Sequence, residues 1–172
     1  MVSPWLFQGI FNQVNMLESQ SCAVASGDKS LMRADRIEEL TRLFYKKASL
    51  IRYFGMEISF SDEGNAVIEL AYNPNLDNLS GAIHGGVFAT LMDIAGGFTA
   101  ALAHEEPCSV ATTDMSVHYL APARQTSLRA VGRLLKSGRR QKVAEMYLYD
   151  AKGKLVAHGT GTFIVRPAIS LE

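Results

Sequence analysis

The chain has 172 residues, 48% of them hydrophobic and 20% charged, which is the composition of a globular protein large enough to bury one core. Seventeen Lys and Arg balance seventeen Asp and Glu, so no overall field draws the chain to nucleic acid or to an anionic membrane. The two cysteines, Cys22 and Cys108, are far apart and have no second Cys or His at metal-ligand spacing, which argues against a disulfide framework and against a metal site.

Residues 1–32 are expected to form an extension outside the main domain. A Ser-Pro pair opens a run with apolar residues at helical spacing, which predicts a short amphipathic helix over 4–18. The stretch 19–30 is rich in Ser, Ala and Gly without a period, as in a linker. Because the first basic residue is Lys29, the apolar start lacks the positive segment of a secretory signal, and we expect a cytoplasmic protein.

The main domain is predicted to open with a helix and a hairpin. Asp35 begins a capping-box pattern, and the apolar face that follows continues to Gly55. Apolar and polar residues then alternate from Met56, turn at 62–65, and alternate again as far as Tyr72. A two-residue period on both sides of a turn predicts two antiparallel strands.

The segment 85–103 is apolar on every side except for one charge, Asp93, and predicts a long helix. A membrane span is one interpretation, but a charge at mid-helix costs about 2.5–3.5 kcal/mol on insertion scales. Four of the nineteen residues are Gly, and strands with a two-residue period follow at once. We therefore predict a helix buried on all sides in a soluble fold.

Four further strands are predicted over 110–120, 127–136, 141–149 and 155–165. In the first, Met115, Val117 and Tyr119 share one face, while Thr112, Asp114, Ser116 and His118 share the other. The order of elements indicates an α+β fold whose antiparallel sheet curls around the central helix. Because such a sheet has two edges and one face that is only partly covered, we expect at least a homodimer.

Four short motifs occur in order along this domain: HGG at 84–86, LMDIA at 91–95, DMSVHYLAPA at 114–123 and SGRR at 137–140. Together they resemble the hot-dog-fold acyl-CoA thioesterases of the phenylacetic-acid-degradation (PaaI-like) type, over roughly residues 33–166. The flanking segments, 1–32 and the tail 167–172, fall outside the resemblance.

The resemblance implies a hot-dog fold and hydrolysis of a coenzyme A thioester at a site shared by two subunits, in a homodimer or, as is common in this family, a homotetramer. It implies no metal and no cofactor, since coenzyme A is part of the substrate. The family's catalytic carboxylate falls on Asp93, and a hydroxyl that assists water falls on Thr112, although the strand register leaves Thr113 open. The family's other catalytic positions fall on Asn78, a polar residue, and on His84 and Gly85 of the turn that polarises the thioester carbonyl. Gly86, the last residue of that turn, is a substrate-binding position.

The residues themselves support part of this chemistry. A lone aspartate on an apolar helix needs a partner, a water or a function, and desolvation that raised its pKa would suit a base. Without the motif, a structural role for Asp93 is an equal alternative. Gly85 and Gly86 leave a helix N-terminus open to an oxyanion, whereas glycines by themselves also serve close packing.

The spacing of the two parts favours a composite site. Nine residues separate His84 from Asp93, which is about 900° of helical rotation and places the two side chains on opposite sides of one helix. A site that takes the HGG turn from one protomer and Asp93 from its mate resolves this geometry.

The turn between the predicted strands 127–136 and 141–149 is basic. Its N–H and guanidinium groups suit the phosphates of coenzyme A, and the resemblance makes Ser137, Gly138 and Arg139 substrate-binding candidates. The alternative is a solvated hairpin tip. No GxSxG, Walker or HExxH motif occurs, so serine hydrolases, P-loop nucleotidases and zinc peptidases lose support.

The predicted function is therefore an acyl-CoA thioesterase with Asp93 as general base or nucleophile and the Gly85 and Gly86 N–H groups as the oxyanion hole. A non-catalytic acyl-CoA binding module on the same fold is the main alternative, because a fold does not fix a function. A hot-dog hydratase or dehydratase ranks third, since such enzymes typically place a catalytic His near the helix start.

Overall fold

The computed structural model describes residues 26–167, so the predicted helix at 4–18 and most of the predicted tail at 167–172 lie outside the described residues. By its contacts the chain divides into two compact units, Met1–Met32 and Arg33–Glu172. The strands and the central helix all belong to the second unit.

Helix α1 (Ser26–Lys47) begins earlier than its sequence suggests. The predicted linker over 19–30 is therefore wrong from Ser26 onward. The weak helix formers Ser and Gly cost little at a helix start. From Arg33 on, α1 packs through the buried side chains of Leu40 and Phe44.

The predicted helix that runs from Asp35 to Gly55 is broken in two. Ala48 is extended (φ −96°, ψ 96°) and separates α1 from α2 (Ser49–Phe54). Gly55 closes α2 with a left-handed φ of 71°, as its position in the sequence predicts. The Arg52 guanidinium donates hydrogen bonds to two carbonyls in the last turn of α1, so the break leaves these acceptors bonded.

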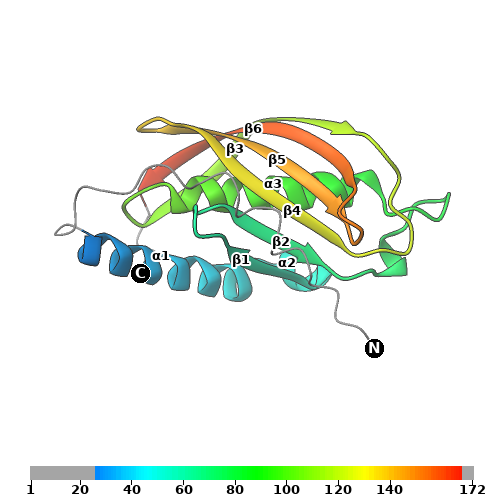
Figure 1. Ribbon diagram of the computed structural model, residues 1–172, viewed down its shortest axis with the longest axis horizontal. Coiled ribbons are helices and arrows are strands. Elements are labelled where there is room, and N and C mark those ends of the chain that lie inside the picture. Colours follow the sequence, from blue (N-terminus) through cyan, green and yellow to red (C-terminus); the bar gives the residue numbers. More distant parts are fainter. Residues whose placement is uncertain (1–25, 168–172) are drawn as a thin grey trace, which may run out of the picture. The chain divides into compact units, whose positions relative to one another are not determined.

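The strands that follow α2 form one six-stranded antiparallel sheet in the order β1-β2-β4-β5-β6-β3. Its strands confirm the predicted hairpin and the four later strands: β1 (Met56–Phe60), β2 (Ala66–Leu70), β3 (Cys108–Tyr119), β4 (Leu128–Ser137), β5 (Gln141–Asp150) and β6 (Leu155–Pro167). A short 3-10 helix, η2 (Pro74–Leu76), leads from β2 toward the central helix α3 (Gly85–Leu102). Figure 1 shows the sheet curving over α3, which confirms the predicted α+β hot-dog architecture.

Helix α3 is long and apolar enough to cross a membrane by composition, but it packs against β2, β3, β4, β5 and β6 as the core helix of this sheet. Gly132 on β4 permits the close approach: a Cβ there would lie 2.4 Å from the carbonyl oxygen of Ala95. The buried Thr99 hydroxyl also accepts a hydrogen bond from the Ala66 N–H at 2.9 Å. Sheet and helix thus share one core.

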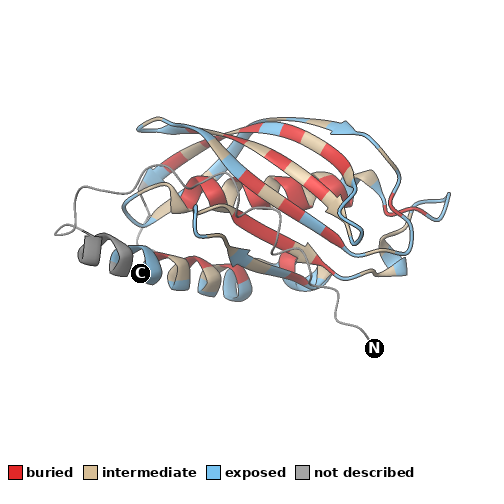
Figure 2. Ribbon diagram, in the orientation of Figure 1, coloured by how far each residue is buried: buried red, intermediate tan, exposed pale blue. Residues whose placement is uncertain are grey.

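One face of α3 is left uncovered by the chain's own sheet. Gly86 is exposed, and Thr90, Asp93 and Gly97 along the same face are half-buried, whereas Leu91 and Ala95 on the sheet side are fully buried. Figure 2 shows both buried and half-buried segments along α3. The prediction that every side of this helix is buried is therefore wrong for the single chain. A curled sheet of six strands closes around part of the helix only.

Candidate active site

Asp93 lies on the uncovered face of α3 and is held by a hydroxyl from β3. The Thr112 Oγ1 donates to Asp93 Oδ1 at 2.7 Å. The carboxylate is half-buried, and Oδ2 makes no hydrogen bond within the described part of the chain. An oriented carboxylate with one oxygen free can accept a proton from water or attack a carbonyl carbon.

The register left open between Thr112 and Thr113 is settled by an irregularity in β3. The pairing of β3 with β6 shifts between Thr112 and Asp114, so Thr113 is the extra residue of a bulge. Its hydroxyl donates to the Thr162 carbonyl oxygen at 3.1 Å, away from Asp93. Ahead of the bulge Thr112 bonds to Asp93 on α3, whereas beyond it Met115 and Val117 pack against the core. The prediction that Thr112 shares a face with Asp114, Ser116 and His118 is therefore wrong.

The N-terminus of α3 is capped by His84. Its Nδ1 accepts a hydrogen bond from the Gly86 N–H at 2.9 Å. An accepting Nδ1 carries no proton, so the neutral ring carries its proton on Nε2, where it can be donated outward. Of the two N–H groups predicted to bind the oxyanion, that of Gly86 is therefore engaged, whereas that of Gly85 has no partner among residues 26–167.

Asn78 shapes the loop in front of α3. Its Oδ1 accepts hydrogen bonds from the Ser80 N–H at 2.9 Å, the Ser80 hydroxyl at 2.7 Å and the Ala82 N–H at 3.3 Å. The side-chain oxygen is thus fully used by its own turn. The amide NH₂ remains the group through which this exposed side chain can contact a ligand.

A groove of about 420 Å³ begins beside this helix start. Its lining combines three apolar side chains with a polar end: Phe54, Leu76, Val87, Asn75, Asp77, His84, Gly86 and Thr90. Sequence reasoning missed Asp77, whose Oδ2 accepts from the Tyr72 hydroxyl at 2.8 Å; this hydrogen bond raises the pKa of Tyr72. The groove is shallow and open, and it leads from these apolar side chains to the His84 turn.

The basic turn between β4 and β5 borders a second hollow of about 330 Å³, lined by Gly138, Arg139 and neighbouring residues. The Gly138 N–H donates to the Gln141 carbonyl oxygen at 2.9 Å and is therefore not free for a phosphate. The basic pattern of this turn suggests that Lys142 is a surface cation, but the residue is buried. It is 4% exposed, and its Nζ donates to Ser137 Oγ at 2.6 Å. Alternation along β5 directs this lysine inward.

The structure therefore brings some of the predicted residues together and leaves others apart. Asp93 and Thr112 form one pair, and His84 with Gly86 forms another. Within the described residues, no hydrogen bond joins the Asp93 pair to the His84 turn or to the β4–β5 turn.

Comparison with known proteins places the chain in a family. A sequence model described as the thioesterase superfamily matches residues 80–157. A Halobacterium salinarum protein, named only provisionally as an esterase, is 32% identical over 143 residues, which cover 77% of this chain and 94% of that protein. The Escherichia coli medium/long-chain acyl-CoA thioesterase YigI is 27% identical over 129 residues, covering 66% of this chain and 83% of YigI.

Solved structures agree on the fold. The PaaI protein of the Escherichia coli phenylacetic acid degradation operon matches with a TM-score of 0.70 at 18% identity, covering 81% of this chain and 96% of PaaI. The motifs that flank and occupy α3 lie inside or next to the segment that the family model matches. The chain belongs to the thioesterase superfamily, a family of hot-dog-fold hydrolases that act on thioesters.

Proposed function

We propose that this protein is an acyl-CoA thioesterase that hydrolyses a coenzyme A thioester to the free acid and CoA. The observation that carries the proposal is the Asp93 carboxylate, held by Thr112 at 2.7 Å on the one face of α3 that its own sheet leaves uncovered. A half-buried carboxylate with a fixed orientation and a free oxygen has the form of a catalytic base or nucleophile.

The reaction follows from the groups at the two sites. In the general-base form, the Asp93 carboxylate takes a proton from water, and the water oxygen bonds to the thioester carbon. The Gly85 N–H, which has no partner in the described residues, donates to the carbonyl oxygen as it becomes an oxyanion. The C–S bond then breaks, and the departing thiolate takes the proton held by Asp93 to become CoA, which returns the carboxylate. In the nucleophilic form, an Asp93 oxygen bonds to the thioester carbon and the C–S bond breaks to release the CoA thiolate; water then cleaves the resulting anhydride to the free acid and the Asp93 carboxylate.

We place these groups in one site through a second copy of the chain. Within one chain, Gly86 and Asp93 lie on the same uncovered face of α3, so the predicted placement of the two parts on opposite sides of the helix is wrong for this turn. They are still separated by about two helical turns, roughly 10 Å along the axis, and share no hydrogen bond among the described residues. β3 is a twelve-residue edge strand, and an unpaired edge next to an open helix face suits a two-fold partner. Each site would then combine Gly85 of one protomer with Asp93 of its mate, in a cytoplasmic homodimer or homotetramer.

The remaining candidates bind and orient the substrate. Arg139, exposed beside the hollow at the β4–β5 turn, is suited to hold a CoA phosphate, with Ser137 and Gly138 shaping the turn. The NH₂ of Asn78 positions water or the thioester, since its oxygen is used within the loop. His84 donates through Nε2 to the bound thioester from the groove.

Thiol release from short, medium, long and aromatic acyl-CoA esters tests this proposal, with wild type compared with Asp93→Asn. Turnover of at least one ester class, abolished in a variant that keeps its oligomeric state, supports it. Binding of acyl-CoA without turnover of any ester would instead favour a binding module. A single turnover in H₂¹⁸O then separates the two forms, since ¹⁸O found in the Asp93 carboxylate excludes the simple general-base route.

A further inference from the structure

Tyr119, the last residue of β3, lies over the first residue of α3. A Cβ built on Gly85 would lie 3.1 Å from Tyr119 Cε1, 3.5 Å from Cζ and 3.7 Å from Cδ1. The edge of the tyrosine ring therefore rests on the Gly85 Cα. The same ring lies 6.2 Å from the ring of Phe88, one turn further along the helix, with 34° between the two planes.

The position of this ring is fixed by the backbone on both sides. Tyr119 pairs with Ala157 at the point where β3 leaves the sheet. The next two N–H groups, of Leu120 and Ala121, both donate to the Val156 carbonyl oxygen, at 2.9 Å and 3.2 Å. Further on, the Ala123 carbonyl oxygen accepts from the Ile83 N–H at 2.9 Å, two residues before Gly85. The segment after β3 and the start of α3 are thus one connected unit.

Gly85 needs such support. It is the first residue of α3, where the N–H has no intrahelical acceptor, and glycine has the widest backbone freedom of any residue. An oxyanion donor works only if it is held in place before the reaction. The Gly85 N–H itself makes no hydrogen bond among the described residues, but the His84 carbonyl oxygen in the same peptide plane accepts from the Val87 N–H at 2.9 Å and so ties one side of this unit. The Tyr119 ring packs against the other side, at the Gly85 Cα.

We propose that Tyr119 is a positioning residue that holds the Gly85 N–H in the direction required for oxyanion binding. The inference rests on the proposed thioesterase function and adds a residue to it. Tyr119 acts through its ring, because the contacts are made by ring carbons and its hydroxyl makes no hydrogen bond within the described part of the chain. Tyr119 is 56% exposed, so its ring packs on the start of α3 from the surface and not from within the core.

Steady-state kinetics give the first test. Tyr119→Ala is expected to lower kcat about 10- to 100-fold with KM changed less than about threefold, because the loss concerns the transition state. Tyr119→Phe keeps the ring and is expected to stay within about twofold of wild type. Tyr45→Ala, which removes a partly exposed tyrosine from α1, controls for the loss of an aromatic side chain. Equal losses in Tyr119→Phe and Tyr119→Ala would overturn the role of the ring.

A second readout does not depend on activity. Labelling with ¹³C-carbonyl His and ¹⁵N-Gly selects the His-Gly pairs, of which the sequence has two, at Gly85 and Gly159. Gly159 is buried in β6 and serves as an internal reference. In ligand-free wild type and Tyr119→Phe, the ¹⁵N order parameter of Gly85 should be close to the rigid value of about 0.85. In Tyr119→Ala it should fall clearly, while that of Gly159 is unchanged.

The kinetics and the Gly85 order parameter together distinguish a failure of the positioning role from a failure of the proposed function. An unchanged Gly85 order parameter in folded Tyr119→Ala overturns the positioning role, whatever the kinetics show. If wild type hydrolyses no acyl-CoA ester, the proposed function fails, and the oxyanion role of the pair fails with it. A fall in both the order parameter and kcat, with both restored in Tyr119→Phe, supports the proposal.

Discussion

The two ends of α3 differ in whether their backbone groups find hydrogen-bond partners within the described residues. At its C-terminus the last carbonyls find donors: the Ala101 oxygen accepts from the His104 N–H and the Cys108 thiol, and the Ala103 oxygen accepts from Lys142 Nζ. At its N-terminus the Gly85 N–H has no partner in the described residues and a groove lies alongside. Helix ends that are saturated by their own chain stabilise a fold, whereas an end with free donors can bind a ligand.

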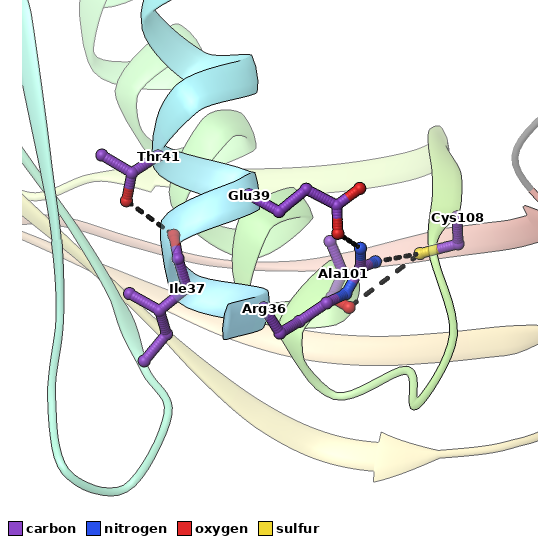
Figure 3. Close-up of polar contacts among 6 residues, drawn as sticks. All are labelled: Arg36, Ile37, Glu39, Thr41, Ala101 and Cys108. Atoms are coloured by element: carbon purple, nitrogen blue, oxygen red, sulfur yellow. Dashed lines mark hydrogen bonds and ion pairs between the residues drawn. The ribbon is translucent and has the colours of Figure 1, made fainter. Parts of the chain in front are cut away.

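The saturated end is also where α1 docks. Arg36, 8% exposed, donates from one amino group to Glu39 and from the other to Cys108 Sγ at 3.2 Å (Figure 3). Nearby, the rings of Phe44 on α1 and Phe98 on α3 meet edge to face at 5.3 Å. Substitutions at this end should therefore change stability, and substitutions at the other end or on the open face should change turnover.

The largest expected effect is at the α1–α3 contact. Phe44 is fully buried, so Phe44→Ala should lower the free energy of unfolding by about 3–5 kcal/mol. Chemical denaturation measures the change, and Leu50→Ala, an exposed position on α2, is the control, expected to differ by less than about 0.5 kcal/mol. A large fall in kcat under conditions where Phe44→Ala is folded would contradict the division between the two ends.

Thr112→Val should lower turnover and leave stability nearly unchanged. Losing a hydrogen bond to a charged group is worth about 1.5–3 kcal/mol, so kcat should fall about 10- to 100-fold, with little change in unfolding free energy. Thr113→Val is the matched control, because its hydroxyl bonds to the Thr162 carbonyl oxygen and not to Asp93. If both variants lost the same activity, the assignment of Thr112 to Asp93 would be wrong.

Lys142→Ala should lower the free energy of unfolding by about 1–2 kcal/mol, because it leaves the Ala103 oxygen without this donor and empties the space of the lysine stem. Thermal and urea denaturation measure it against Lys152→Ala, at an exposed turn. An unchanged or raised stability would mean that the cost of burying the ammonium exceeds the value of its bonds.

The smallest expected effect is a pH dependence at Cys108. Burial raises the pKa of this thiol above its ordinary value of 9.0, a shift that the nearby Arg36 guanidinium partly offsets. Above pH 9.0 the unfolded chain loses a proton that the folded chain keeps, so stability falls as pH rises. Between about pH 8 and pH 10, Cys108→Ala should lose less stability than wild type, by less than about 1 kcal/mol. Parallel curves would show that other groups account for the slope, such as the half-buried Tyr147 and Tyr149, whose pKa values are also raised by burial.

Most of this fold can be predicted from the sequence because apolar residues recur with regular helical or two-residue spacing. Alternation along 141–149 and 155–165 and the apolar run at 85–103 mark elements that the structure confirms to within two residues at most ends. The break at Ala48 has no sequence signal, since neither Gly nor Pro is present there and alanine is the best helix former. The early start of α1 is hidden by a composition that also suits a linker.

The candidate site is predicted less completely, for geometric reasons. The extra residue Thr113 shifts by one the set of β3 side chains that face α3. A threonine at that position does not by itself predict a bulge. The inward direction of Lys142 follows from strand alternation, but its neighbours on the turn are also basic, so the sequence favours a solvent-exposed cluster. Asp77 and Tyr119 reach the start of α3 from other parts of the chain, and such contacts carry no local pattern.

The most direct test of the central claim is activity in a mixed dimer of two inactive variants. Gly85→Pro removes the N–H at the first helical position, where the preceding His84 already has ψ 138°. Because its Cβ would lie 3.1 Å from the Tyr119 ring, which must shift slightly, the fold and dimeric state of this variant are checked first. It is co-expressed with Asp93→Asn under a second affinity tag, and the mixed species is purified. One intact site per dimer should restore about half of wild-type thiol release, because the intact Gly85 and Asp93 come from different chains. A folded mixed dimer as inactive as its parents would show that each site is built within a single chain.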